Sequence, residues 1–259
     1  MQNRYAGDIG DFSKFVLLCS LVGNDLRLGI VWYLNVAEEA NHDGALTRYP
    51  QLRGYSADLF DQLASVANGN DRSIAALEAC GVVPKTALFF GTPVPTSSRL
   101  DSLAGFNHRD QWLRMAAAAV READVLFLDP DNGIAPPGVA KFSGRSVKYI
   151  YVEEIAYLFG KGHSIVLYQH HQRKPLEACI SEQIKRFSEL TTTWALSFRK
   201  RSVRTYFVLA QAKHKDMLWD RTIQLMNSPM GVDGCFRLHT LQRKDCASER
   251  RATLAERTA

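Results

Sequence analysis

Two short segments of the sequence are apolar almost without interruption: VLFL at 125–128 and SIVLY at 164–168. A strand with one face in water alternates apolar and polar residues. A central strand of a parallel sheet is covered by helices on both faces and is apolar throughout. These segments are therefore predicted to be central strands of a parallel sheet. Strands are predicted at 28–35, 86–91, 124–128, 164–169, 193–198 and 204–211.

Helical periodicity occupies the segments between most of these strands. Several of them begin with Asp or carry Pro in the first turn, as the N-termini of helices prefer. Helices are predicted at 11–22, 58–67, 71–80, 108–122, 147–159, 175–190 and 215–227. The alternation of strands and helices predicts the α/β class, with a Rossmann-like, doubly wound and mostly parallel sheet.

The last two predicted strands differ from this pattern. Only five residues, 199–203, separate the strand at 193–198 from the strand at 204–211. A parallel pair needs a crossover of a dozen residues or more, so these strands are predicted to form an antiparallel hairpin. The mostly parallel sheet is thus expected to end in an antiparallel hairpin.

The composition is that of a globular protein with its own hydrophobic core. The chain has 259 residues, of which 46% are hydrophobic and 23% charged. This excludes intrinsic disorder and collagen-like repeats. Apolar residues become rare after residue 240. One α/β domain is therefore predicted over 1–240, followed by a basic C-terminal tail over 241–259.

The net charge of +5 is unevenly distributed along the chain. Residues 1–198 carry 19 basic and 21 acidic side chains, whereas residues 199–259 carry 13 basic and 6 acidic ones. A local excess of Lys and Arg is typical of proteins that bind a polyanion, although a solvated tail can also be basic. Nucleic acid, DNA or RNA, is therefore the predicted partner.

The cysteines and the N-terminal segment indicate a cytoplasmic protein. The five cysteines are odd in number and have no C-x-x-C spacing, so neither a disulfide framework nor a zinc ribbon is predicted. The N-terminal residues are polar, and the apolar run that follows them, 15–22, is about half a membrane span and lacks the cleavage pattern of a signal peptide. No membrane association is expected.

The strongest candidate for a site is FLDPDNG at 127–133, where a predicted strand runs directly into polar residues. Ligands of parallel sheets bind beyond the carboxyl ends of the strands. Pro130 restricts the backbone of Asp129 to extended conformations and so fixes the direction of its carboxylate. Asp129, Pro130, Asp131 and Asn132 are therefore predicted catalytic-site residues. The alternative is a simple turn, since all these residue types favour turns.

A second candidate is YQHHQR at 168–173, which follows the next predicted strand of the sheet. His170 is a candidate acid or base in catalysis, and Arg173 is a candidate contact to nucleic acid. Neighbouring histidines of an extended chain point to opposite sides, so one of the two is expected to face a site. The alternative role of such a histidine is a structural hydrogen bond.

The N-terminal segment GDIGDFSK at 7–14 is a third candidate. Asp11 is predicted to cap the helix that carries Lys14, and the backbone N–H groups at that helix start, together with Lys14, could meet an anion. The alternative is an ordinary cap and a solvated lysine.

A divalent metal is considered only as an alternative. Glu153 and Glu154, together with Asp129, Asp131 and His170, would offer ligands for phosphodiester chemistry. No H-x-H, H-E-x-x-H or D-x-D-x-D-G spacing supports such a site, so no metal ligand is predicted.

The turn of the predicted hairpin is rich in cations. Arg199, Lys200, Arg201 and Arg204 lie within six residues and are predicted to contact the phosphates of a nucleic acid. Charged residues at a sheet edge also prevent edge-to-edge aggregation, and the two roles are compatible.

The order of these features resembles the class I methyltransferases that modify the N6 amine of adenine in ribosomal RNA. DFSK at 11–14 is similar in spacing and position to a segment that precedes their first strand, and LFLDPDNG is similar to the strand that ends in their Asp-Pro-Pro-Tyr motif. The resemblance implies S-adenosylmethionine as cofactor, contacted by Asp11, Lys14 and Asn35. It also implies that Asp129 and the adjoining backbone accept the hydrogens of the target amine of a flipped base.

Two positions differ from that family, and they keep other functions open. VAEE at 36–39 stands in place of a Gly-x-Gly loop, and Asn132 stands in place of the aromatic residue. The first hypothesis is methyl transfer to a base amine. The second is a nucleic-acid hydrolase, acting on a phosphodiester or N-glycosidic bond, in which Asp129 or Asp131 activates water and His170 is the acid or base. The third is a non-catalytic binding protein on a methyltransferase fold.

Overall fold

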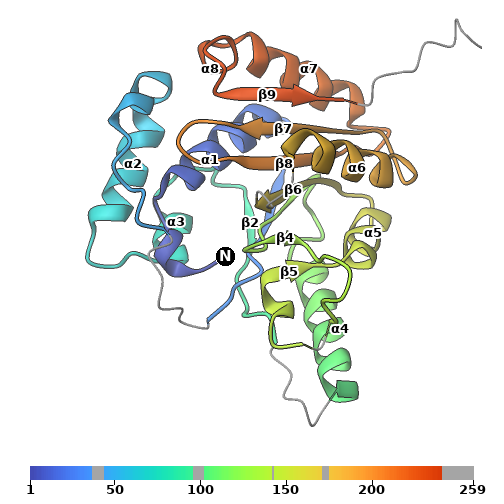
Figure 1. Ribbon diagram of the computed structural model, residues 1–259. Coiled ribbons are helices and arrows are strands. Elements are labelled where there is room, and N and C mark those ends of the chain that lie inside the picture. Colours follow the sequence, from blue (N-terminus) through green and yellow to red (C-terminus); the bar gives the residue numbers. More distant parts are fainter. Residues whose placement is uncertain (37–43, 96–101, 142, 171–174, 241–259) are drawn as a thin grey trace, which may run out of the picture.

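The structure is a computed structural model that describes residues 1–36, 44–95, 102–141, 143–170 and 175–240. Within these residues a seven-stranded sheet runs through the centre of the molecule, with helices on both of its faces (Figure 1). The α/β class predicted from the sequence is confirmed, and the arrangement is compatible with a Rossmann-like fold. The predicted tail, 241–259, lies outside the described residues.

The elements have the following bounds. The strands of the main sheet are β1 (Leu28–Val31), β2 (Leu88–Phe90), β3 (Val125–Leu128), β6 (Ser164–His170), β7 (Thr193–Phe198), β8 (Arg204–Leu209) and β9 (Phe236–His239). The helices are α1 (Ile9–Val22), α2 (Ala57–Asn68), α3 (Ile74–Ala79), α4 (Ser102–Ala119), α5 (Val152–Gly160), α6 (Leu176–Ser188), α7 (Lys215–Asn227) and α8 (Pro229–Val232). Short 3₁₀ helices are η1 (Asn3–Tyr5), η2 (Pro50–Tyr55) and η3 (Ser146–Lys148), and a separate two-stranded parallel sheet pairs β4 (Gly133–Ile134) with β5 (Tyr149–Ile150).

The strand order of the main sheet is β2-β1-β3-β6-β8-β7-β9. Strands β2, β1, β3 and β6 are parallel, β8 is antiparallel to both β6 and β7, and β9 is antiparallel to β7. The antiparallel hairpin predicted from the five-residue spacing is therefore confirmed. Its strands are nevertheless interior, because β8 lies between β6 and β7, and β9 lies beyond β7. The edge-protection role suggested for the basic hairpin is wrong for this reason.

Residues of each central strand alternate between two apolar layers. In β3, Val125 and Phe127 pack with residues of α1, α2, α3 and α7, whereas Leu126 and Leu128 pack with residues of α4, α5 and α6. All four are fully buried. Burial on both faces is the reason why this strand is apolar at every position.

Several predicted boundaries differ from the structure. The segment predicted as one helix at 147–159 contains η3 and β5 before α5 begins at Val152. The helix predicted at 71–80 begins at Ile74, after Ser73 accepts a hydrogen bond from the Ala76 N–H. Strand β1 ends at Val31 rather than at residue 35, because Tyr33 has a φ of 44°, which no strand accommodates.

Among the described residues, no helix combines the length and the apolar character that a membrane crossing requires.

A buried hydrogen bond between β7 and α7 provides a test of this packing. The Trp194 indole N–H donates to the Thr222 hydroxyl at 3.0 Å, and both side chains are buried. Thr222→Val keeps the shape but leaves the indole N–H without an acceptor, so we expect the free energy of unfolding to fall by about 1–3 kcal/mol in urea titrations. Thr222→Ser retains the acceptor and serves as the control. A Thr222→Val protein no less stable than Thr222→Ser would contradict this assignment.

Candidate active site

A cavity of about 270 Å³ lies at the carboxyl ends of β3 and β6, where the sheet predicted from the sequence would place a site. Its wall combines the start of α1, the residues after β3, the end of β6 and the first residue of β8. Asp11, Lys14, Asp129, Pro130, Asp131, Asn132 and His170 all line it, so the structure brings together three of the segments that the sequence singles out.

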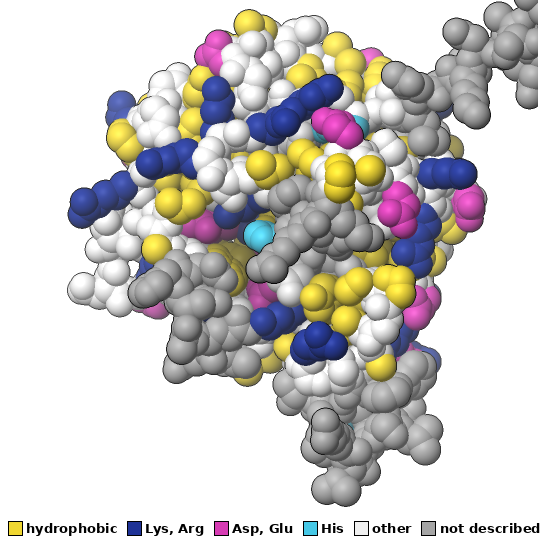
Figure 2. Space-filling model, viewed as in Figure 1, with side chains coloured by type: hydrophobic (Ala, Val, Ile, Leu, Met, Phe, Trp, Pro, Cys, Tyr) yellow, Lys and Arg dark blue, Asp and Glu magenta, His cyan; other side chains and the backbone are white. Residues whose placement is uncertain are grey.

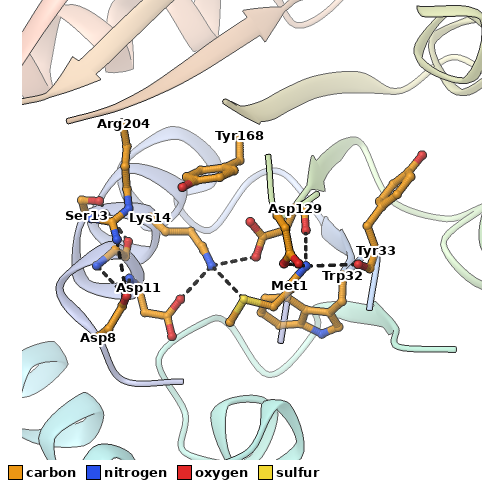
Figure 3. A network of polar contacts seen from close by, with 12 residues as sticks. Met1, Asp8, Asp11, Ser13, Lys14, Trp32, Tyr33, Asp129, Tyr168 and Arg204 are labelled. Carbon is orange, nitrogen blue, oxygen red and sulfur yellow. Dashed lines mark hydrogen bonds and ion pairs between the residues drawn. The ribbon is translucent and has the colours of Figure 1, made fainter. Parts of the chain in front are cut away.

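Lys14 lies at the centre of a buried ion network (Figure 3). Its Nζ is 2.7 Å from Asp11 Oδ1 and 2.7 Å from Asp129 Oδ2, and it lies over the rings of Trp32 and Phe127 at 5.5 and 5.7 Å from their centroids. Burial alone would lower the pKa of Lys14, but the two carboxylates raise it far above its ordinary value. Lys14 is therefore a permanent cation and not a solvated surface lysine.

The pKa values of the two carboxyls that contact Lys14 are also raised, but by burial. Burial raises the pKa of Asp129 above its ordinary value, although Lys14 and the Met1 ammonium oppose the shift. Burial and the neighbouring Asp8 also raise the pKa of Asp11. The described ion pair of the Asp129 side chain is made by Oδ2, and the residue lines the cavity.

Helix α1 is capped by Asp8, whereas the sequence predicts Asp11 as the cap. The Asp8 carboxylate accepts hydrogen bonds from the N–H groups of Gly10 and Asp11 at 2.7 and 3.1 Å. Asp11 instead lies in the first turn, where it accepts from the Gly7 N–H and pairs with Lys14. The capping role is wrong for Asp11 because the helix begins two residues earlier, at Ile9.

Asp131 binds the N-terminal segment. Its Oδ1 is 2.6 Å from the ammonium nitrogen of Met1, and its Oδ2 accepts hydrogen bonds from the side-chain amides of Gln2 and Asn35 at 2.8 and 3.2 Å. Burial alone would raise the pKa of Asp131, but the ammonium and the two amides hold it below its ordinary value. Asn35, predicted to contact a cofactor, thus orients a carboxylate of the cavity.

The turn after β3 is fixed by Gln169, at the end of β6. The Gln169 side chain donates to the Asn132 carbonyl and accepts from the Ile134 N–H, each at 2.9 Å. Gly133 has a φ of 89°, and a Cβ at this position would lie 2.4 Å from the Gln169 amide oxygen. Glycine is therefore required at the end of the DPDNG segment, both for its backbone conformation and for the close approach of Gln169.

Arg204 is part of the cavity and not of the exposed basic surface. Its guanidinium lies against the backbone of Gly10 and is 3.4 Å from Asp8 Oδ2, with a side chain only 12% exposed. The prediction that Arg204 contacts phosphates on the surface does not fit this placement. Arg204 has this position because it is the first residue of β8, where its side chain points inward toward α1.

The other predicted cations and the histidine lie near the rim. Arg199 and Arg201 are exposed, Lys200 is half-buried, and Arg201 donates to the Arg48 carbonyl. His170 is exposed and lies 3.4 Å from the Tyr168 hydroxyl through Nδ1. Arg173 lies outside the described residues.

The alternative metal cluster is not formed. Glu154 is buried in an ion pair with Arg109, and Glu153 pairs with Lys141, so neither lines the cavity with Asp129. In the described part of the chain, no three His, Cys, Asp or Glu side chains are grouped as metal ligands.

Negative charge is in excess among the buried groups of the cavity. Four carboxylates, those of Asp8, Asp11, Asp129 and Asp131, face two side-chain cations, Lys14 and Arg204. The ammonium of Met1 offsets one further charge. The arrangement favours a ligand that brings positive charge into the cavity.

Comparisons with known proteins do not assign a family. No family model matches the chain, and no curated protein matches it. A solved structure, protein LPL1258 from Legionella pneumophila with the family description DUF519, is similar over 92% of this chain and 99% of its own length, at 10% identity and a TM-score of 0.40. At this level the similarity supports no conclusion about function.

The ion network provides a test of the site. Lys14→Met leaves Asp11 and Asp129 buried without a counter-charge, so we expect the free energy of unfolding at neutral pH to fall by about 3–5 kcal/mol. Lys85→Met removes an exposed lysine and should stay within about 0.5 kcal/mol of wild type. Equal stabilities of the two variants would contradict the bridging role of Lys14.

The loss of stability in Lys14→Met depends on pH. Removing the cation raises the pKa values of Asp11 and Asp129 further above those of the unfolded chain, so both take up a proton on folding. The destabilisation is then complete above the folded pKa values and disappears as the pH falls through them toward about 4. Urea titrations at about pH 5 and about pH 8 measure this difference. A deficit that is unchanged between them would show that these carboxyls do not titrate with folding.

Proposed function

We propose that the protein transfers the methyl group of S-adenosylmethionine to an exocyclic amine of a base in nucleic acid. The observation that carries the proposal is the excess of buried carboxylates in the cavity at the ends of β3 and β6. A sulfonium cofactor is cationic both at its sulfur and at its amino group, so these carboxylates complement it. The parallel strands β2, β1, β3 and β6 are followed in the sheet by the antiparallel hairpin β7–β8, a combination that class I methyltransferases also have, and this supports the same proposal.

Asp129 is the residue that receives the amine in this proposal. Lys14 binds Oδ2 and so orients the carboxylate, and in this proposal Oδ1 accepts a hydrogen bond from the amine. The cofactor, when bound, supplies an electrophilic methyl group on sulfur. Lys14 is then a positioning residue, because it acts on the amine only through Asp129.

The aromatic surface that Asn132 lacks is available elsewhere in the cavity. Tyr168, on β6, also lines the cavity; it lies near Asp129 and is almost fully buried (Figure 3). Aromatic faces of this kind stack on bases that have been flipped out of a duplex or that come from a single strand. Tyr168 therefore takes the stacking role in this proposal.

The proposed partner, nucleic acid, suits the rim of the cavity. In the space-filling view, Lys and Arg side chains lie around the hollow in which a histidine is visible (Figure 2). Arg48, Arg199 and Arg201 are exposed, and the Arg201–Arg48 hydrogen bond joins the hairpin turn to the loop whose residues Gly44–Leu46 line the cavity. A backbone that follows this rim would place one nucleotide over the acidic interior.

A hydrolase is the second candidate, and the observation in its favour is that His170 lines the same cavity as Asp129. In this alternative His170 would protonate the leaving group while Asp129, whose pKa burial raises, would activate water. Asp131 is a poor base here, because its pKa is held low.

Ligand binding and methyl transfer test the proposal together. We expect calorimetry to show binding of S-adenosylmethionine and S-adenosylhomocysteine, and labelled methyl groups to enter DNA or RNA. In Asp129→Asn, methyl transfer at saturating cofactor should fall roughly 100-fold or more. Asp71→Asn, at an exposed position, is the control. Absence of binding with the wild-type protein would overturn the proposal, and strand cleavage that Asp129→Asn abolishes would favour the hydrolase.

The rim provides a separate test of the nucleic-acid partner. In Arg199→Gln/Arg201→Gln, the negative slope of log K against log salt concentration should become shallower by about 0.7–0.9 for each phosphate that the protein no longer neutralises. Arg114→Gln/Arg121→Gln removes two exposed arginines of the α4 region and should leave the slope unchanged. Equal slopes for wild type and both variants would exclude the hairpin turn as a phosphate-binding element.

A further inference from the structure

A second cavity, here called the side cavity, adjoins the candidate active site. It has a volume of about 120 Å³ and is lined by the residues after β4, the end of β6, α6 and β8. His170 lines both cavities, while Asn132 lines the first and Ile134 the side cavity. Gln169 binds the backbone of both Asn132 and Ile134, so its side chain lies at the boundary between the two cavities.

The side cavity is large enough for an organic group. A single water molecule needs only roughly 10–15 Å³ of such space, so the side cavity holds more than isolated waters. It is therefore a candidate binding site that shares its rim, at His170, with the cavity that contains Asp129.

The interior of the side cavity is apolar. Its apolar side chains come from three segments: Pro136 and Pro137 after β4, Leu176 and Ile180 on α6, and Phe207 on β8. Among the described residues that line it, the acidic and basic ones are Glu182 and Arg186, and both are exposed. A buried anion would have no cation inside this cavity, whereas the flat and uncharged ring of a base would be well accommodated. The side cavity thus differs in chemistry from the acidic cavity beside it.

One polar atom of the side cavity lacks a partner. In the part of the chain that the structure describes, the side-chain oxygen of Gln183 is buried and accepts no hydrogen bond. The Gln183 side chain is half-buried and lines the side cavity. The terminal torsion of a glutamine rotates over a broad range, so this oxygen can turn toward a ligand and gain the hydrogen bond that it lacks. An N–H donor on the ligand would satisfy it.

We propose that the side cavity binds a second base of a nucleic-acid strand, the neighbour of the base that lies over Asp129. The identity of the ligand as nucleic acid rests on the proposed function. The two cavities share His170 at their rim, so consecutive nucleotides of one strand can reach both. Gln183 then accepts a hydrogen bond from an exocyclic amine, which adenine, cytosine and guanine carry and uracil lacks. The side cavity is thereby a specificity site for the nucleotide next to the target.

The contact of Gln183 is tested with two single-stranded oligonucleotides, one of adenosine and one of purine riboside, which is adenosine without the amine. Gln183→Leu should weaken binding of the adenosine strand about 3- to 10-fold and leave binding of the purine strand unchanged, since one hydrogen bond is lost. The amine over Asp129 does not contribute to this difference, because Gln183→Leu leaves that cavity intact. Gln224→Leu, at an exposed position of α7, should change neither affinity. An equal change for both strands would overturn the contact.

Occupation of the side cavity is tested on the wild-type protein with a thiol reagent. Cys179 is half-buried and lines the side cavity, whereas Cys80, also half-buried, lies at the end of α3. The adenosine strand should slow alkylation of Cys179 in proportion to the fraction of protein bound and leave alkylation of Cys80 unchanged, as measured by peptide mass spectrometry. Alkylation of Cys179 at the same rate with and without the bound strand would overturn the proposal.

These measurements distinguish failure of the side cavity from failure of the proposed function. If Gln183→Leu discriminates between the strands and Cys179 is protected, but no methyl group enters the strand, the side cavity is retained and methyl transfer is rejected. If methyl transfer occurs while both strands respond alike and Cys179 is not protected, methyl transfer is retained and the side cavity is rejected.

Discussion

A single buried ammonium joins the parts of the molecule that make the cavity. Lys14 Nζ bridges a carboxylate of its own helix and the carboxylate that ends β3, so it fixes α1 against the sheet. Without a cation at this place, two acids would lie close together in a region that excludes water. The position of the helix, the direction of Asp129 and the opening of the cavity therefore depend on the same two ion pairs.

The remaining charges extend this network to distant parts of the chain. Asp8 caps α1 and also meets Arg204 at the start of β8, while Asp131 holds the N-terminal residues against the ends of β1 and β3. Three of the four carboxylates of the cavity, those of Asp8, Asp129 and Asp131, thus have a cation from another segment, and Asp11 has one from its own helix. The charged residues of the cavity come from four segments: the N-terminus, the start of α1, the residues after β3 and the start of β8. Displacement of any one of these segments would change the net charge of the cavity.

The sequence predicts the parts of this structure that depend on local pattern. The apolar strands, the hairpin and the position of Asp129 at a strand end all follow from runs of neighbouring residues. The cap at Asp8 was missed because two aspartates compete for it three residues apart. Strand β9, the inward direction of Arg204 and the contacts of Met1 were missed because they depend on pairing between segments far apart in the chain. No signal in the local sequence indicates that Tyr33 leaves the strand.

Gln169 and Gly133 belong to different strand ends, yet neither is free to vary alone. A side chain at 133 would enter the space of the Gln169 amide, and a shorter side chain at 169 would leave the Asn132 carbonyl and the Ile134 N–H without their partner. In homologous chains these two positions are therefore expected to covary.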